Sequence, residues 1–142
     1  MKSEADRLDA IITEHRHRDG PLLPILHDIQ HTFGAIDEAA KRHVAAALNL
    51  TRAEVHGVVS FYHDFRETPV GRPVIKLCRA EACQARGGEA LAAKAADIAG
   101  DRVAIEAVYC LGLCSIGPAA MVGETPHARL DEAALARLVA ES

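Results

Sequence analysis

The sequence predicts an α+β fold in which an all-helical segment, residues 1–68, precedes an α/β segment, residues 69–142. Apolar residues recur at helical spacing through the first segment, whereas short runs rich in β-branched residues alternate with helix-forming stretches in the second. The connector RETPVGRP, residues 66–73, holds two prolines and a glycine and separates the two patterns. We therefore expect two domains, an N-terminal helical bundle and a C-terminal domain of β-α-β-β-α order.

Four helices are expected in the first segment. The opening helix has an apolar face near Leu8 and Ile12, and the second, LLPILHDIQHTF, carries an apolar stripe that Gly34 is placed to end. The third, DEAAKRHVAAALNL, is rich in alanine. Thr51 and Glu54 form a capping box at the start of the fourth helix. The apolar stripe of that helix, expected in the core, is Val55, Val58, Val59, Tyr62 and Phe65.

The second segment is expected to form four strands and two helices. VIKLC and VAIEAVYC are the longer strands, and the alanine-rich helix GGEALAAKAADIAG connects them. PAAMVG and PHARL are two shorter strands around a Gly-Glu turn, and DEAALARLVAES is the closing helix. Alternation of strands and helices in this order is typical of an α/β domain.

Composition excludes several functional classes. The net charge is −4, so no nucleic-acid partner is expected, and the HRHR run at residues 15–18 is interpreted as a solvated helix end. The N-terminus lacks the apolar region of a secretory signal, and no apolar run approaches the roughly 20 residues that span a bilayer. We therefore expect a cytoplasmic protein without direct membrane insertion, in which thiols stay reduced.

All four cysteines lie in two short stretches, Cys78 with Cys83 and Cys110 with Cys114. Each pair follows a predicted strand, and ligands gather at the carboxyl ends of strands in open α/β sheets. Four thiolates at one point repel each other unless a cation neutralises them. Zinc, an iron–sulfur cluster and oxidation to disulfides are the candidate solutions.

The spacing of the cysteines favours a [2Fe–2S] cluster. Each of its two irons takes two thiolates, which matches a C-x₄-C pair beside a C-x₃-C pair, whereas zinc sites usually have C-x₂-C knuckles. Four glycines allow backbone amides to approach the sulfurs, namely Gly87, Gly88, Gly112 and Gly117. A zinc-closed interaction module remains the alternative from another class. A dithiol redox site is disfavoured, because there is no C-x₂-C motif.

Other polar residues have simpler interpretations. His27 and His31 have metal-binding spacing but lie on the polar face of their helix, where surface placement is expected. Arg79 and Arg86 either interact with the charge of a cluster or are solvated. No nucleotide loop, nucleophile elbow or acid/base pair is present, so no catalytic residue is assigned. A redox centre without a substrate site indicates an electron carrier within a larger enzyme.

The motifs CRAEACQARGG and YCLGLCSIGPAAMV, together with GVVSFY, resemble the thioredoxin-like [2Fe–2S] ferredoxin family. This family includes the 24-kDa subunit of respiratory NADH dehydrogenase and small subunits of NAD-reducing hydrogenases and NAD-dependent formate dehydrogenases. The stretch KLCRAEACQARGGEAL is most similar to the gamma subunit of the cytoplasmic molybdenum-containing formate dehydrogenase. The resemblance covers almost the whole chain, although the stretch between Cys83 and Cys110 is shorter than the family norm.

The resemblance implies a thioredoxin-like C-terminal domain with one [2Fe–2S] cluster. By matching motif, Cys78 and Cys83 bind one iron, and Cys110 and Cys114 bind the other. Implied partners are a diaphorase subunit with FMN and NAD, and a subunit with a molybdenum cofactor that oxidises formate. A 24-kDa-type subunit, a hydrogenase subunit and a free-standing ferredoxin are alternatives. We expect residues 1–68 to serve as a docking element for the flavin subunit.

Overall fold

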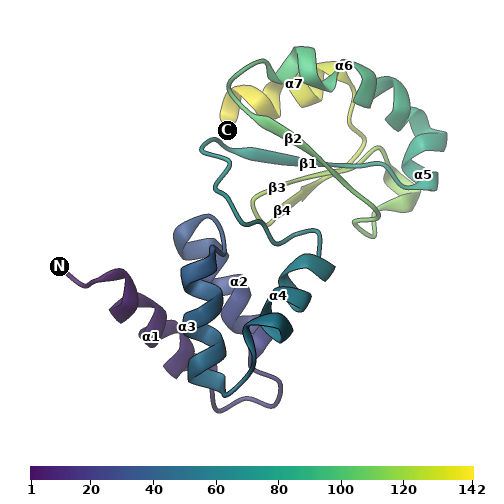
Figure 1. Cartoon of the computed structure of the whole chain (residues 1–142). Coiled ribbons are helices and arrows are strands. Elements are labelled where there is room, and N and C mark those ends of the chain that lie inside the picture. Colours follow the sequence, from purple (N-terminus) through teal and green to yellow (C-terminus); the bar gives the residue numbers. More distant parts are fainter. The chain divides into compact units, whose positions relative to one another are not determined.

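The computed structural model describes residues 1–142, which divide into two compact units, Met1–Pro69 and Val70–Ser142 (Figure 1). The first unit is helical and the second contains a mixed four-stranded sheet with helices, so the predicted α+β fold class is confirmed. None of the helices has both the length and the apolar character needed to cross a bilayer.

The first unit consists of four helices joined by short loops. They are α1 (Glu4–His15), α2 (Leu22–Phe33), α3 (Glu38–Leu48) and α4 (Arg52–Phe61). The predicted capping box at Thr51 and Glu54 is present, with the Thr51 hydroxyl accepting from the Glu54 amide. Gly34 ends α2 in the left-handed conformation, with φ of 83°, as its position predicted.

Apolar side chains from all four helices form the core of the first unit. This core contains Leu8, Ile12, Ile25, Leu26, Ile29, Ile36, Val44, Val55 and Val59. The expectation for Tyr62 was wrong, because 43 % of this residue is exposed. Helix α4 ends at Phe61 and Tyr62 adopts extended backbone angles, so its side chain leaves the helical stripe. Phe65 is buried, but from the segment that follows the helix.

The HRHR run is only partly the solvated helix end that was expected. Arg16, His17 and Arg18 are exposed, but His15 is buried and its Nε2 contacts Asp28 Oδ2 on α2. His15 is the last residue of α1 and lies on the same helix face as Leu8 and Ile12. The charged residues that follow it in the sequence hid this position on the apolar face.

The segment after α4 is bound to the helices. The Gln30 side chain donates to the carbonyl of Asp64 and accepts from the amide of Arg66. The amide of Ile36 donates to the Arg66 carbonyl. Glu67, the next residue, receives a hydrogen bond from Lys41, so the start of the connector belongs to the helical unit.

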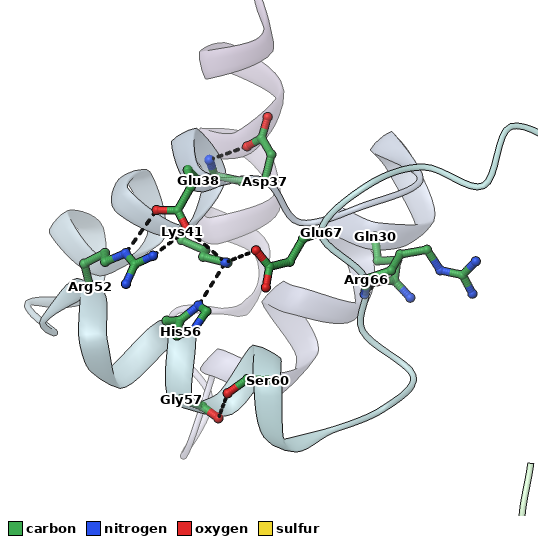
Figure 2. Close-up of polar contacts among 11 residues, drawn as sticks. Gln30, Asp37, Glu38, Lys41, Arg52, His56, Gly57, Ser60, Arg66 and Glu67 are labelled. Atoms are coloured by element: carbon green, nitrogen blue, oxygen red, sulfur yellow. Dashed lines mark hydrogen bonds and ion pairs between the residues drawn. The ribbon is translucent and has the colours of Figure 1, made fainter.

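Lys41 is the largest fully buried side chain of the molecule, with 0 % exposure. Its ammonium group donates to Glu38 Oε1 at 3.0 Å, to Glu67 Oε2 at 2.9 Å and to His56 Nδ1 at 3.0 Å (Figure 2). All three ammonium hydrogens thus have acceptors, which a buried lysine requires. Arg52 also pairs with Glu38 through two hydrogen bonds. Nothing in the sequence pattern predicted this buried charge.

The second unit is built on a sheet of order β2-β1-β3-β4. The strands are β1 (Val74–Cys78), β2 (Ala104–Val108), β3 (Ala120–Val122) and β4 (Thr125–His127). β1 and β2 are parallel and are connected through α6 (Glu89–Ala99), while β3 and β4 form an antiparallel hairpin beside β1. The last helix, α7 (Glu132–Glu141), packs with α6 on one face of the sheet (Figure 1).

The core of the second unit lies between the sheet and these two helices. Ile75 and Leu77 of β1 point toward it, together with Leu91 of α6 and Leu135 of α7. Alternation along β1 leaves Val74 and Lys76 on the opposite face. Between β1 and α6 the chain forms a short helix, α5 (Glu81–Cys83), and a kinked turn, η1 (Gln84–Gly88), in which Arg86 and Gly87 have non-helical backbone angles. A 3₁₀ turn, η2 (Cys114–Ile116), follows β2.

Candidate metal centre

The two cysteine stretches begin where the two parallel strands end. Cys78 is the last residue of β1 and is in register with Val108, the last residue of β2. The ladder continues for one more hydrogen bond, from the Arg79 amide to the Val108 carbonyl at 2.8 Å. Because parallel strands end at the same edge of a sheet, both stretches leave the sheet side by side.

The four cysteines are free thiols that differ in burial. Cys78 and Cys83 are buried with Ala119, and Cys110 and Cys114 are exposed. Cys83 lies at the end of α5, in the same buried cluster as Cys78. The Sγ atoms of Cys110 and Cys114 are 3.6 Å apart. The Cys110 amide lies 3.3 Å from Cys78 Sγ, so the structure brings the two cysteine stretches together.

The donor set fits a thiolate-bound metal. A tetrahedral ion with metal–sulfur bonds of about 2.3 Å holds two thiolates about 3.8 Å apart. The separation of the Cys110 and Cys114 sulfurs, 3.6 Å, is close to that value. Apolar side chains surround the buried pair, namely Ala80, Val108, Leu111 and Leu113. The arrangement thus offers two sulfur pairs, one in an apolar wall and one at the surface.

Backbone amides point at the sulfurs. The Cys110 amide donates to Cys78 Sγ at 3.3 Å. The Gly112 amide donates to Cys110 Sγ at 3.4 Å, which confirms the prediction for this glycine. N–H groups directed at thiolates stabilise their negative charge and tune the potential of a bound iron–sulfur group.

The thiols respond differently to this environment. Burial raises the pKa of Cys78, but hydrogen bonds from the backbone of Ala80, Cys110 and Leu111 and from the Cys83 side chain lower it by more. The net shift of the Cys78 pKa is therefore downward. Burial and the hydrogen bond with Cys78 raise the pKa of Cys83. The hydrogen bond with Cys110 and the charge of Cys110 raise the pKa of Cys114. An ionised neighbouring sulfur therefore opposes the ionisation of Cys83 and of Cys114.

Two glycines fit closely against Cys83. A Cβ at Gly117 would lie 2.9 Å from Cys83 Sγ, and a Cβ at Gly88 would lie 2.6 Å from the Cys83 carbonyl oxygen. Any larger residue at these positions would displace the backbone or the sulfur of Cys83. Gly88 and Gly117 thus allow the chain to pack closely around Cys83. The sequence prediction for these two glycines was different, namely that they let backbone amides approach the sulfurs.

The two arginines near the first cysteine pair differ in their surroundings. Arg79 forms two hydrogen bonds with Glu89, at 3.0 and 3.1 Å. Arg86 is exposed, and its Cδ lies 3.5 Å from the position of a Cβ at Gly117. The role of Glu89 was not predicted, because its distance of ten residues from Arg79 carries no periodic signal.

The candidate histidines lie outside this group of cysteines. His27 and His31 are exposed on α2, and the ring of His27 lies 4.8 Å from that of Phe65. Both residues belong to the helical unit.

Comparison with known sequences identifies several similar proteins. The family model described as thioredoxin-like [2Fe–2S] ferredoxin matches residues 8–142. The NADP-reducing hydrogenase subunit HndA of Solidesulfovibrio fructosivorans is 31 % identical over 133 residues, covering 87 % of this chain and 78 % of that protein. An NADH-quinone oxidoreductase subunit of Escherichia coli (strain K12) is 30 % identical over 149 residues, covering 96 % and 89 % of the two chains.

A solved structure is also similar. A chain of the NAD⁺-reducing [NiFe]-hydrogenase, determined in the H₂-reduced state, superposes with a TM-score of 0.71 at 27 % sequence identity. The match covers 84 % of the present chain but only 22 % of the hydrogenase chain, which is much longer.

Proposed function

This chain belongs to the thioredoxin-like [2Fe–2S] ferredoxin family and carries a [2Fe–2S] cluster, and on that premise we propose that it is an electron-transfer subunit of an NAD(P)-linked oxidoreductase. The observation that carries this proposal is the meeting of two cysteine pairs at the carboxyl ends of two parallel strands, within a chain that matches the family along almost its full length.

Each cysteine pair is proposed to hold one iron, Cys78 with Cys83 and Cys110 with Cys114. The sulfur separation in the second pair and the amides directed at Cys78 support this assignment. Replacing any one of the four with Ala should lower the iron content of the purified chain severely. His27→Ala and His31→Ala serve as matched controls, and an equal loss of iron in these variants would contradict the ligand set.

The residues of the chain supply the environment, and the bound cluster supplies one-electron chemistry. Ala119, Leu111 and Leu113 keep water from the buried sulfur pair. The exposed pair, Cys110 and Cys114, lies beside the exposed ring of Tyr109, where a redox partner can approach. We infer that electrons are exchanged on this exposed side of the site.

The parent enzyme is proposed to be a cytoplasmic NAD-dependent formate dehydrogenase. This assignment is supported by the resemblance of KLCRAEACQARGGEAL to the gamma subunit of that enzyme. The partners are then a diaphorase subunit with FMN and NAD and a molybdenum subunit that oxidises formate. The similarity to HndA and to the NADH-quinone oxidoreductase subunit favours two alternatives, a hydrogenase and a respiratory NADH dehydrogenase.

Affinity purification distinguishes these parent enzymes. The tagged chain, isolated from its native cell, should bring down a flavin subunit, a molybdenum subunit and formate-dependent NAD⁺ reduction. Co-purification of hydrogen-dependent reduction, or of membrane-embedded subunits, would contradict the formate dehydrogenase assignment and identify one of the alternatives.

A further inference from the structure

Two arginines lie near the buried cysteine pair, and only one of them is neutralised. Arg79 directly follows Cys78, and its guanidinium group forms two hydrogen bonds with the carboxylate of Glu89. The two charges cancel within a planar, bidentate pair. The Arg79–Glu89 pair therefore contributes little net charge to its surroundings.

Arg86 has no ion-pair partner in the structure. It lies in the kinked turn η1, three residues after Cys83, and the residue is exposed. Glu81, at the start of α5, is a carboxylate near it in sequence, but the two side chains form no ion pair. Arg86 is thus a cation that no carboxylate compensates.

The stem of Arg86 runs beside the sulfur of Cys83. The position of a Cβ at Gly117 is 2.9 Å from Cys83 Sγ and 3.5 Å from Arg86 Cδ. The missing side chain at Gly117 therefore leaves room for both neighbours. Arg86 Cδ and Cys83 Sγ thus both lie next to the same position, the absent side chain of Gly117.

A positive charge at this place affects reduction. One-electron reduction adds one negative charge to a site that already contains four thiolates, and a nearby cation stabilises the added charge. Because Arg86 is exposed, solvent and salt weaken its effect. Arg86 Cδ and Cys83 Sγ flank the same Gly117 position, which is closer than the screening length of about 10 Å at 0.1 M salt, so the effect is not abolished.

We propose that the positive charge of Arg86 raises the reduction potential of the [2Fe–2S] site, and that Arg79 does not act in this way because Glu89 neutralises it. The inference rests on the proposed ligation by Cys83. It assigns different roles to two arginines that the sequence alone presents as equivalent.

The test is a mediated redox titration of the full-length chain, followed by EPR. Arg86→Gln should shift the equilibrium for reduction about tenfold toward the oxidised state, which corresponds to a potential about 59 mV lower. Arg86→Lys, which keeps the charge, should retain most of the wild-type potential. Arg86→Met keeps an aliphatic stem against Gly117 and should behave like Arg86→Gln. The shift should become smaller at high ionic strength.

The Arg79–Glu89 pair provides the matched control. The double variant Arg79→Gln/Glu89→Gln removes both charges and should keep the wild-type potential. Glu89→Gln alone leaves Arg79 uncompensated and should raise the potential. A double variant that lowers the potential as much as Arg86→Gln does would overturn the distinction between the two arginines.

The iron and sulfide content of the chain distinguishes a failure of the proposed function from a failure of the role proposed for Arg86. A wild-type chain without iron and sulfide would refute the proposed function. A fully loaded Arg86→Gln chain with unchanged potential would refute only the role of Arg86. Equal shifts in Arg86→Gln and Arg86→Lys would also refute it, since they would indicate an effect of packing rather than charge.

Discussion

The ammonium group of Lys41 is 2.9 Å from the carboxylate of Glu67, so a fully buried lysine on α3 holds the segment that follows α4. Two further acceptors, on Glu38 and His56, complete its hydrogen bonds. Helix α3, helix α4 and the start of the connector thus meet at one charged atom.

Lys41→Ala should destabilise the helical unit. The substitution removes a buried side chain, leaves Glu67 without its cation and leaves Glu38 paired with Arg52 alone. A loss of about 2–4 kcal/mol is expected from comparable truncations. Urea unfolding followed by circular dichroism measures it. Arg42→Ala, at an exposed position on the same helix, is the control and should change stability by less than about 0.5 kcal/mol. Equal effects of the two substitutions would show that the Lys41 network contributes nothing.

The pH dependence of this network follows from its carboxylates. Hydrogen bonds from Arg52 and Lys41 lower the pKa of Glu38 from its usual 4.5 to about 2. The hydrogen bond from Lys41 likewise lowers the pKa of Glu67. A carboxyl group whose pKa is lower in the folded than in the unfolded state stabilises the fold at pH values above its usual pKa. For Glu38 this stabilisation is lost as the pH falls from 4.5 toward 2.

An NMR titration of the Glu38 side-chain carboxyl carbon tests this directly. Its midpoint should lie near 2 in the wild-type chain. Arg52→Gln should move the midpoint upward, because it removes the main cause of the shift. A wild-type midpoint near 4.5 would show that the pair with Arg52 does not persist in solution.

Gly117→Ala should disturb the site through packing alone. The backbone angles of Gly117, φ −64° and ψ 167°, suit any residue, but the new methyl group would lie 2.9 Å from Cys83 Sγ. Overpacking of this kind costs about 1–3 kcal/mol, and we expect it to lower the thermal stability of the iron-loaded chain.

Gly57→Ala is the matched control for this substitution. Gly57 lies within α4 and has open space around the position of a Cβ, so alanine should stabilise the helix by about 0.5–1 kcal/mol. If Gly117→Ala retains wild-type stability and iron content, Cys83 has more room than the structure indicates.

Local signals in the sequence predicted much of the fold. The Thr51–Glu54 capping box, the glycine that ends α2 and the strands that lead to Cys78 and Cys110 depend on residues close together in the chain. The meeting of the two cysteine stretches was also predictable, because both follow strands of one sheet. The features that were not predicted depend instead on tertiary contacts.

Lys41 shows why these other features were not predictable. Its helix is alanine-rich and charged, and nothing in its spacing reveals that Glu67 and His56 approach from later parts of the chain. Tyr62 left its predicted stripe because α4 ends one residue earlier. The contact between Glu89 and Arg79 was not predicted for the same reason. It requires the turn η1 to bring the first residue of α6 close to the residue that follows β1.

Measurement of iron and acid-labile sulfide in the anaerobically purified full-length chain tests the central claim, that the two cysteine pairs hold one two-iron cluster. The account predicts two irons and two sulfides for each chain, since each iron takes one pair of thiolates. It also predicts an S = 1/2 EPR signal after reduction by one electron. Stoichiometric zinc without iron in the native preparation would contradict it.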